Sequence, residues 1–227
     1  MPISFSLPRA ATGVALVAAS LAGCFGSVAE VKRRHFLLEG APQGQNPGPS
    51  HDMATALPAQ GTLWVKDFQV HAIYDRAQLV HRLSPQEVRF SRDEVWAARA
   101  GRMLADAVAR HWLLHTPFLA VSRSAGELQA PYTLSGEITA LEVVEPSGLG
   151  DSAVAHLAWV LQLVDTSSGK TLGQYVFDDT LALQTSGSGG GQVAAALDTL
   201  VGQATAKAAQ DVRRDLSPAA STAQALP

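Results

Sequence analysis

The chain has 227 residues, of which 47% are hydrophobic and 16% are charged, and its formal net charge at pH 7 is −3. This apolar content is sufficient for a hydrophobic core, so a fully disordered chain is excluded. The slight acidic excess, with no basic run longer than Lys32–Arg34, argues against a nucleic-acid-binding protein. We therefore expect one folded domain with flexible ends.

Residues 1–23 have the pattern of a secretory signal peptide. They carry a single charge, Arg9, which precedes an apolar run from Ala10 to Ala22. A basic start, a short apolar stretch and small residues before a cleavage point are typical of such signals. The run is too short to cross a bilayer, which needs about 20 apolar residues. A buried core helix that ends in Ala-Gly-Cys is the alternative interpretation.

Leu21-Ala22-Gly23-Cys24 looks like a bacterial lipobox, in which the cysteine is acylated and becomes the mature N-terminus. Cys24 is the only cysteine in the chain, and a lone cysteine in an exported protein needs an explanation, which acylation supplies. Acyl chains such as palmitate would anchor the protein permanently, because two chains already give stable anchoring. Since Phe25 and not an aspartate follows the cysteine, we expect a lipid anchor in the outer membrane and a domain that faces the periplasm.

Residues 24–61 are expected to be a lipid-anchored tether and linker. The triplet Lys32–Arg34 is interpreted as a solvated part of the tether, with contact to anionic headgroups as the alternative. Phe36–Leu38 is a candidate short edge strand, at 36–38. Residues 40–61 are rich in Gly, Pro, Ala and Gln, which is typical of an extended linker. A tether of roughly 35 residues would reach on the order of 100 Å.

The first half of the domain is predicted to contain strands and then a helix. Strand composition covers 63–70, 78–82 and 87–90, with a turn at Tyr74–Arg76. A helix is expected from Ser91 to about His115, because Ser91-Arg92-Asp93-Glu94 has the form of a capping box. Its predicted inward stripe consists of Trp96, Ala100, Met103, Leu104, Ala107, Val108 and His111.

The second half is predicted to contain mainly strands and a closing helix. Strands are expected at 118–121, 131–144, 154–164 and 171–183, with a hairpin turn at 165–170 and a glycine loop at 186–191. The closing helix, 192–214, has an inward stripe of Val193, Leu197, Leu200, Val201, Ala204, Ala208 and Val212. Residues 217–227 are expected to be a flexible tail. This order predicts an α+β fold, with a mostly antiparallel sheet and two amphipathic helices packed on one face.

Three patterns resemble known sites but lack the required context. Ser168–Thr171 ends like a phosphate-binding loop, yet Val164 stands where that motif needs a glycine, and strand follows strand. Gly187–Gly191 precedes a helix without a basic residue in the first turn. His111 and His115 have a metal-ligand spacing but no acidic residue between them. We therefore expect no enzymatic activity, no cofactor and no metal.

Five short blocks between Trp64 and Trp96 form one pattern, followed by the Tyr132–Ile138 strand: Val65–Phe68, Ile73–Arg76, Gln78–Arg82, Val88–Phe90 and Val95–Ala97. This pattern resembles the ABC-type transport auxiliary lipoprotein family, which includes paraquat-inducible protein C. The likeness spans about residues 62–214. The chain departs from the family at His81, where a tyrosine is usual, and at Ala98 and Arg99, where an acidic residue and a proline are frequent.

The resemblance implies a non-enzymatic auxiliary component of an MCE-type lipid transport system. There an inner-membrane ABC transporter and a periplasmic MCE-domain tunnel move lipids between the membranes. The auxiliary domain, 62–216, would dock the tunnel at the outer-membrane end. Candidate docking residues lie on or beside the turn and are expected to be exposed: Tyr74, Asp75, Arg76, Gln78 and Arg82. The alternative is that these residues only form the hairpin geometry.

Two other functions stay open at this point. The first is an outer-membrane assembly or secretin-pilot lipoprotein, which would bind a barrel or a secretin. The second is a lipid-anchored periplasmic hydrolase, which would need catalytic side chains from distant segments in one cleft. A homo-oligomer is also open, because a small ring would suit a tunnel as partner.

Overall fold

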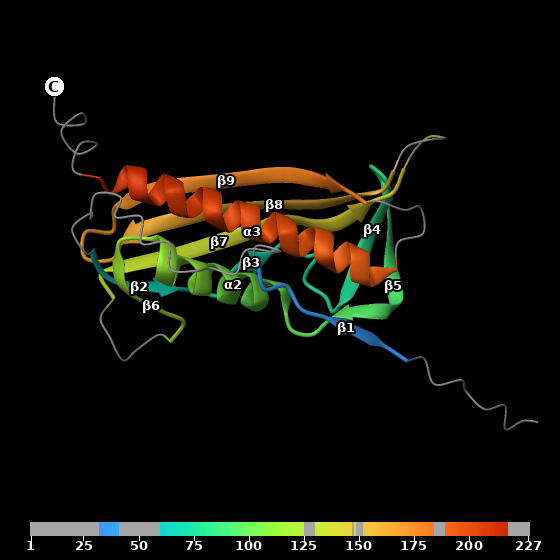
Figure 1. The fold of residues 1–227 in the computed structure, drawn as a ribbon, viewed down its shortest axis with the longest axis horizontal. Coiled ribbons are helices and arrows are strands. Elements are labelled where there is room, and N and C mark those ends of the chain that lie inside the picture. Colours follow the sequence, from blue (N-terminus) through green and yellow to red (C-terminus); the bar gives the residue numbers. More distant parts are fainter. Residues whose placement is uncertain are drawn as a thin grey trace, which may run out of the picture. The chain divides into compact units, whose positions relative to one another are not determined.

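Nine strands form one mixed sheet, and two helices cover one of its faces (Figure 1). The structure is a computed structural model that describes residues 32–40, 60–124, 130–146, 148, 152–183 and 189–217. The expected signal peptide, Cys24 and all of the expected tail after Ser217 lie outside these residues. The prediction of an α+β fold with two helices on one face of a sheet is confirmed.

Three long strands make the continuous part of the sheet. β7 (Tyr132–Val144), β8 (Val154–Asp165) and β9 (Thr171–Ala182) pair antiparallel in chain order. β8 has a strand on both sides, in agreement with its nearly continuous apolar sequence. The predicted hairpin turn closes where the N–H of Asp165 donates to the carbonyl of Lys170 at 2.9 Å, with Gly169 at a φ of 69°.

The other edge of β7 makes the sheet mixed. Three short strands pair with it in succession, all of them parallel: β2 (Gln60–Val65), β3 (Gln69–Val70) and β4 (Gln78–Ser84). The prediction of a mostly antiparallel sheet is therefore wrong. Local turns fix the pairing of hairpin strands, whereas parallel partners come from distant segments that spacing along the chain does not reveal.

The remaining strands extend this sheet on either side. β6 (Phe118–Ser122) lies parallel to β2, and β5 (Glu87–Trp96) lies antiparallel to β4. β1 (Arg34–Phe36) lies parallel to the last residues of β5. The edge strand expected at 36–38 thus lies slightly earlier in the chain.

The first helix, α2 (Ala100–His115), begins later than the capping box predicted. Residues 91–96 instead continue β5. Oε1 of Glu94 accepts a hydrogen bond from the N–H of Gly190 at 2.6 Å, at the start of α3 (Gly190–Asp215). Glu94 therefore does bind a helix N-terminus, but that of a helix 96 residues further along the chain.

A single apolar core lies between the sheet and the helices. Every residue of the predicted α3 stripe is buried. On α2 the prediction placed His111 inward, but Trp112 occupies the core position and is fully buried. Its Nε1 donates to the carbonyl of Thr205 on α3 at 3.3 Å. Trp112 follows Leu104 and Val108 at intervals of four, so it belongs to the same helical stripe.

Residues 34–40 form a strap that crosses from β5 to the helix layer. Leu38 is fully buried, and its N–H lies 3.3 Å from Sδ of Met103 on α2. The N–H groups of Glu39 and Gly40 both donate to Oδ1 of Asp198 on α3, at 2.6 and 2.7 Å. The strap is thus part of the folded domain. No helix in the described ranges is long and apolar enough to cross a membrane.

Replacing Leu38 with Ala should lower the free energy of unfolding by about 3 kcal/mol, because it leaves a cavity between the strap and the helices. Urea denaturation followed by circular dichroism measures this. The matched control is Leu37→Ala, since the Leu37 side chain is 51% exposed, and it should cost less than about 0.5 kcal/mol. Equal effects of the two changes would contradict the role of the strap.

Candidate functional site

The turn between β3 and β4, residues 71–77, contains three of the five predicted docking residues, and the other two, Gln78 and Arg82, lie on β4. The N–H of Tyr74 donates to the carbonyl of His71 at 2.8 Å, which closes the turn. The N–H of Trp96 donates to the carbonyl of Ala77 at 2.6 Å, which fastens the turn to the end of β5. The segment 71–77 is therefore held at both of its ends.

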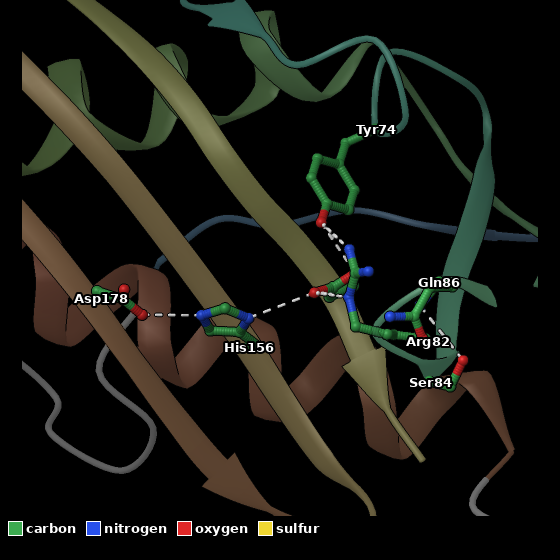
Figure 2. Close-up of polar contacts among 7 residues, drawn as sticks. Tyr74, Arg82, Ser84, Gln86, His156 and Asp178 are labelled. Atoms are coloured by element: carbon green, nitrogen blue, oxygen red, sulfur yellow. Dashed lines mark hydrogen bonds and ion pairs between the residues drawn. The ribbon is translucent and has the colours of Figure 1, made fainter. Parts of the chain in front are cut away.

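Two of the five docking residues point into the molecule (Figure 2). Tyr74 is 4% exposed, so the exposure expected for it is wrong. Its hydroxyl donates to Oε2 of Glu142 on β7 at 2.9 Å. Arg82 on β4 donates from Nε to Oε1 of Glu142 at 2.8 Å and from Nη2 to the Tyr74 hydroxyl at 2.9 Å. The two side chains share a buried carboxylate that the sequence did not single out.

Glu142 is the centre of this charged network, and its side chain is only 3% exposed. Burial raises the pKa of the carboxyl group, but hydrogen bonds from His156, Arg82 and Tyr74 outweigh burial and lower the pKa of Glu142 to about 2. The hydrogen bond to Glu142 in turn raises the pKa of the Arg82 guanidinium. Glu142 is therefore ionised at neutral pH, with its charge balanced by neighbours.

His156 on β8 connects the network to the surface. Its Nδ1 lies 3.4 Å from Oε1 of Glu142, and its Nε2 lies 2.8 Å from Oδ1 of Asp178 on β9 (Figure 2). The hydrogen bond with Glu142 raises the pKa of His156, burial opposes this, and Asp178 adds to the rise. Together these side chains connect the 71–77 turn to β4, β7, β8 and β9, so the network positions the turn rather than presenting a reactive group.

The other three docking residues lie at or near the surface. Asp75 and Gln78 are exposed, and Arg76 is partly exposed. The guanidinium of Arg76 lies 3.8 Å from the centroid of the Phe90 ring on β5, which is a cation–π contact. Asp75 and Gln78 are thus available to a partner protein, whereas the Arg76 guanidinium is partly covered by Phe90.

Two adjoining grooves flank the turn, and they share Asp75, Ala98 and Arg99. The larger one lies between β3 and the start of α2 and includes Arg102. No ion pair within the described part of the chain involves Arg99 or Arg102. Both arginines are exposed, and no sequence pattern showed that they meet the turn.

Gly101 explains why the turn and the helix meet. The N–H of Phe68 donates to the carbonyl of Gly101 at 3.2 Å. A Cβ at position 101 would collide with the backbone of Phe68, so only glycine permits this approach. A glycine on the first turn of the helix was the available signal, although a glycine alone does not say which strand it meets.

The patterns dismissed from the sequence have structural roles where they are described. Ser168–Thr171 lies at the hairpin, where hydrogen bonds from Ser167 and Ser168 lower the pKa of Asp165 to about 2. The rings of His111 and His115 contact each other with centroids 4.2 Å apart and planes tilted by 35°. Residues 186–188 of the glycine loop lie outside the described residues, and Gly190 and Gly191 begin α3. Within those residues, no group of three or more His, Cys, Asp or Glu side chains is arranged to hold a metal ion.

Comparison with known proteins extends these observations. The family model of the ABC-type transport auxiliary lipoprotein component matches residues 45–209, which confirms the resemblance. A search of curated proteins gives no match.

Solved structures share the fold. The chain is similar to a DUF330-family protein from Xanthomonas campestris, with 22% identity, a TM-score of 0.60 and coverage of 75% of this chain and 92% of that chain. An uncharacterized protein is also similar, with 18% identity, a TM-score of 0.56 and coverage of 69% of this chain and 95% of that chain. A PelC dodecamer from Paraburkholderia phytofirmans is a weaker match, with 13% identity, a TM-score of 0.39 and coverage of 67% and 91%.

Replacing Glu142 with Gln should lower the free energy of unfolding by about 3 kcal/mol, because it leaves the Arg82 guanidinium without its carboxylate partner. Urea denaturation at neutral pH measures the loss. Glu137→Gln is the matched control, since Glu137 lies on the same strand and is exposed, and it should change stability by less than about 0.5 kcal/mol. A Glu142→Gln variant as stable as the control would refute the proposed role of the network.

His156 should make stability depend on pH. The pKa of His156 is raised in the folded state by Glu142 and Asp178. Its contribution to the free energy of unfolding is therefore complete below the unfolded pKa of about 6.5, and this contribution is lost as the pH rises through the folded pKa. His156→Gln should therefore destabilise the protein more at about pH 5.5 than at about pH 8.5. Urea denaturation at both pH values measures this, with His35→Gln as an exposed control. An equal loss at both pH values would contradict the assignment.

Proposed function

Because the chain belongs to the ABC-type transport auxiliary lipoprotein component family, we propose that it is a non-enzymatic component of an MCE-type lipid transport system. The match of the family model over residues 45–209 carries this proposal. The transporter in question is an inner-membrane ABC transporter, and the direct partner is its periplasmic MCE-domain protein.

The proposed anchor is an acyl group on Cys24. The small residues before Cys24 and the apolar run of the first 23 residues support export and acylation. Phe25 after the cysteine supports the outer membrane as the destination. The domain then faces the periplasm, where an MCE-domain tunnel can bind it.

The proposed docking surface consists of Asp75, Arg76, Gln78, Arg99 and Arg102 beside the two grooves. Asp75, Arg99 and Arg102 are exposed and make no ion pair within the described residues, and such charges suit recognition of a polar protein surface. Tyr74 and Arg82 act as positioning residues, because their bonds to Glu142 hold the turn.

The absence of a catalytic role is also a proposal. The titratable cluster around Glu142 is occupied with internal hydrogen bonds. Its charged groups therefore hold the 71–77 turn in position. This favours a binding module over a hydrolase.

An in-cell crosslink and pull-down of the tagged full-length protein tests the function. Mass spectrometry should identify an MCE-domain protein and its ABC transporter. The double change Arg99→Glu and Arg102→Glu should reduce this recovery by about tenfold. Acidic residues at the start of a helix favour its dipole, so the change should not unfold α2.

Controls separate docking from anchoring. Lys170→Glu with Lys207→Glu makes the same charge change on exposed residues of the hairpin turn and α3, and it should leave recovery unchanged. Cys24→Ala should release the protein from the outer-membrane fraction. Recovery of a secretin or a barrel protein in place of the MCE-domain protein would replace this function with an assembly or pilot role.

A further inference from the structure

The strap shortens the distance over which the domain can move from its anchor. β1 begins at Arg34, ten residues after Cys24. An extended chain spans at most about 3.6 Å per residue, so the segment from Cys24 to Arg34 spans at most about 35 Å. The sequence alone predicted a reach of on the order of 100 Å. A domain anchored at Cys24 therefore stays close to the bilayer, with the start of β1 nearest to it.

The register of the sheet shows near which end of β7 the strand β1 lies. β1 pairs with β5, β5 with β4, and β4 joins β7 at Val143 and Val144. The end of α2 and the start of β6 lie at the opposite end of β7, because β2 pairs with β6 at Phe118 and with β7 at Tyr132. The 13 residues of β7 span about 40 Å between these ends, at about 3.3 Å per residue.

The end of the domain at β1 and β5 has side chains that suit contact with a membrane surface. Arg33, Arg89 and Arg92 are exposed on or next to β1 and β5, although Arg89 also lies 3.4 Å from Glu145. Phe90 lies between the last two arginines in the sequence and is 38% exposed, with the Arg76 guanidinium over one face of its ring. Arginine side chains with an exposed aromatic ring suit the polar–apolar boundary of a bilayer.

The acidic residues nearby offset this charge in part: Glu145 faces Arg89, whereas Lys32 beside Arg33 adds a fourth exposed basic residue. Glu87 and Asp93 are exposed on β5. Glu94 is bound by Arg34 and by the N–H of Gly190, so its charge is balanced within the protein. Because β1 covers only Glu94–Trp96, the rest of the outer edge of β5 has no strand beside it within the described residues.

We infer that the β1–β5 edge lies against the membrane and binds anionic lipid headgroups through Arg33, Arg89 and Arg92, with Phe90 at the bilayer interface. This inference rests on the proposed function, because it takes Cys24 as the anchor. The opposite end, with the exposed Leu113 and Leu114 side chains, then faces the periplasm.

Photocrosslinking on vesicles tests this arrangement. The mature chain, from Cys24 to Pro227, is coupled through the Cys24 thiol to a maleimide lipid. The photoreactive amino acid p-benzoylphenylalanine is introduced at position 90 or, as a control for the far end, at position 114. In vesicles of phosphatidylethanolamine and phosphatidylglycerol, lipid adducts at position 90 should exceed those at position 114 by about tenfold.

Charge variants test the role of the arginines. The triple change Arg33→Glu, Arg89→Glu and Arg92→Glu should reduce lipid adducts at position 90 by about tenfold. The matched control, Lys170→Glu, Lys207→Glu and Arg213→Glu, changes the net charge equally on other exposed residues, and it should leave the adducts unchanged.

Three results would overturn the inference: equal adducts at the two positions, equal adducts in vesicles of phosphatidylcholine alone, or equal effects of the two charge variants. Chemical coupling supplies the anchor here, so such a failure would count against the edge and not against acylation of Cys24. A failure of acylation would instead appear in the fractionation of the Cys24→Ala variant and the native protein.

Discussion

The backbone edge of β7 is the constraint on which the rest of the domain depends. A buried strand must pair its N–H and C=O groups along its whole length. Here β8 does this on one side, whereas β2, β3 and β4 share the other side in succession. The chain has to leave and re-enter the sheet between these short strands, and the 71–77 turn is one result. The position of the turn follows from the pairing of β3 and β4 with β7, and not from a hairpin between neighbouring strands.

A buried charge then fixes the turn. Glu142 lies on β7, close to where β4 joins it, and an unpaired carboxylate at this depth would be costly. Tyr74 and Arg82 supply its hydrogen bonds from the turn and from β4. The candidate docking residues thus divide by role: two position the turn from inside, and three remain on its surface. A polar network of this kind provides a defined geometry more than it provides net stability.

The strap connects the folded domain to its proposed membrane anchor. Leu38 is fully buried with its N–H against Met103 of α2, and Asp198 of α3 holds the backbone at Glu39 and Gly40. Glu94 completes this arrangement, because it binds both Arg34 of the strap and the start of α3. The same contacts that stabilise the helix layer therefore also limit how far the domain can lie from Cys24.

The sequence by itself determined the long strands β7 to β9, β6, the closing helix and the family, because alternation, helical spacing and turn residues are local signals. It did not determine the start of α2, since the capping pattern at Ser91–Glu94 is the same whether Glu94 binds its own segment or a distant helix. Parallel pairing along β7 and the partners of Glu142 were also beyond its reach. The contacts of Glu142 with Arg82 and Tyr74 join residues 60 and 68 positions apart, and only tertiary packing decides which distant segments meet.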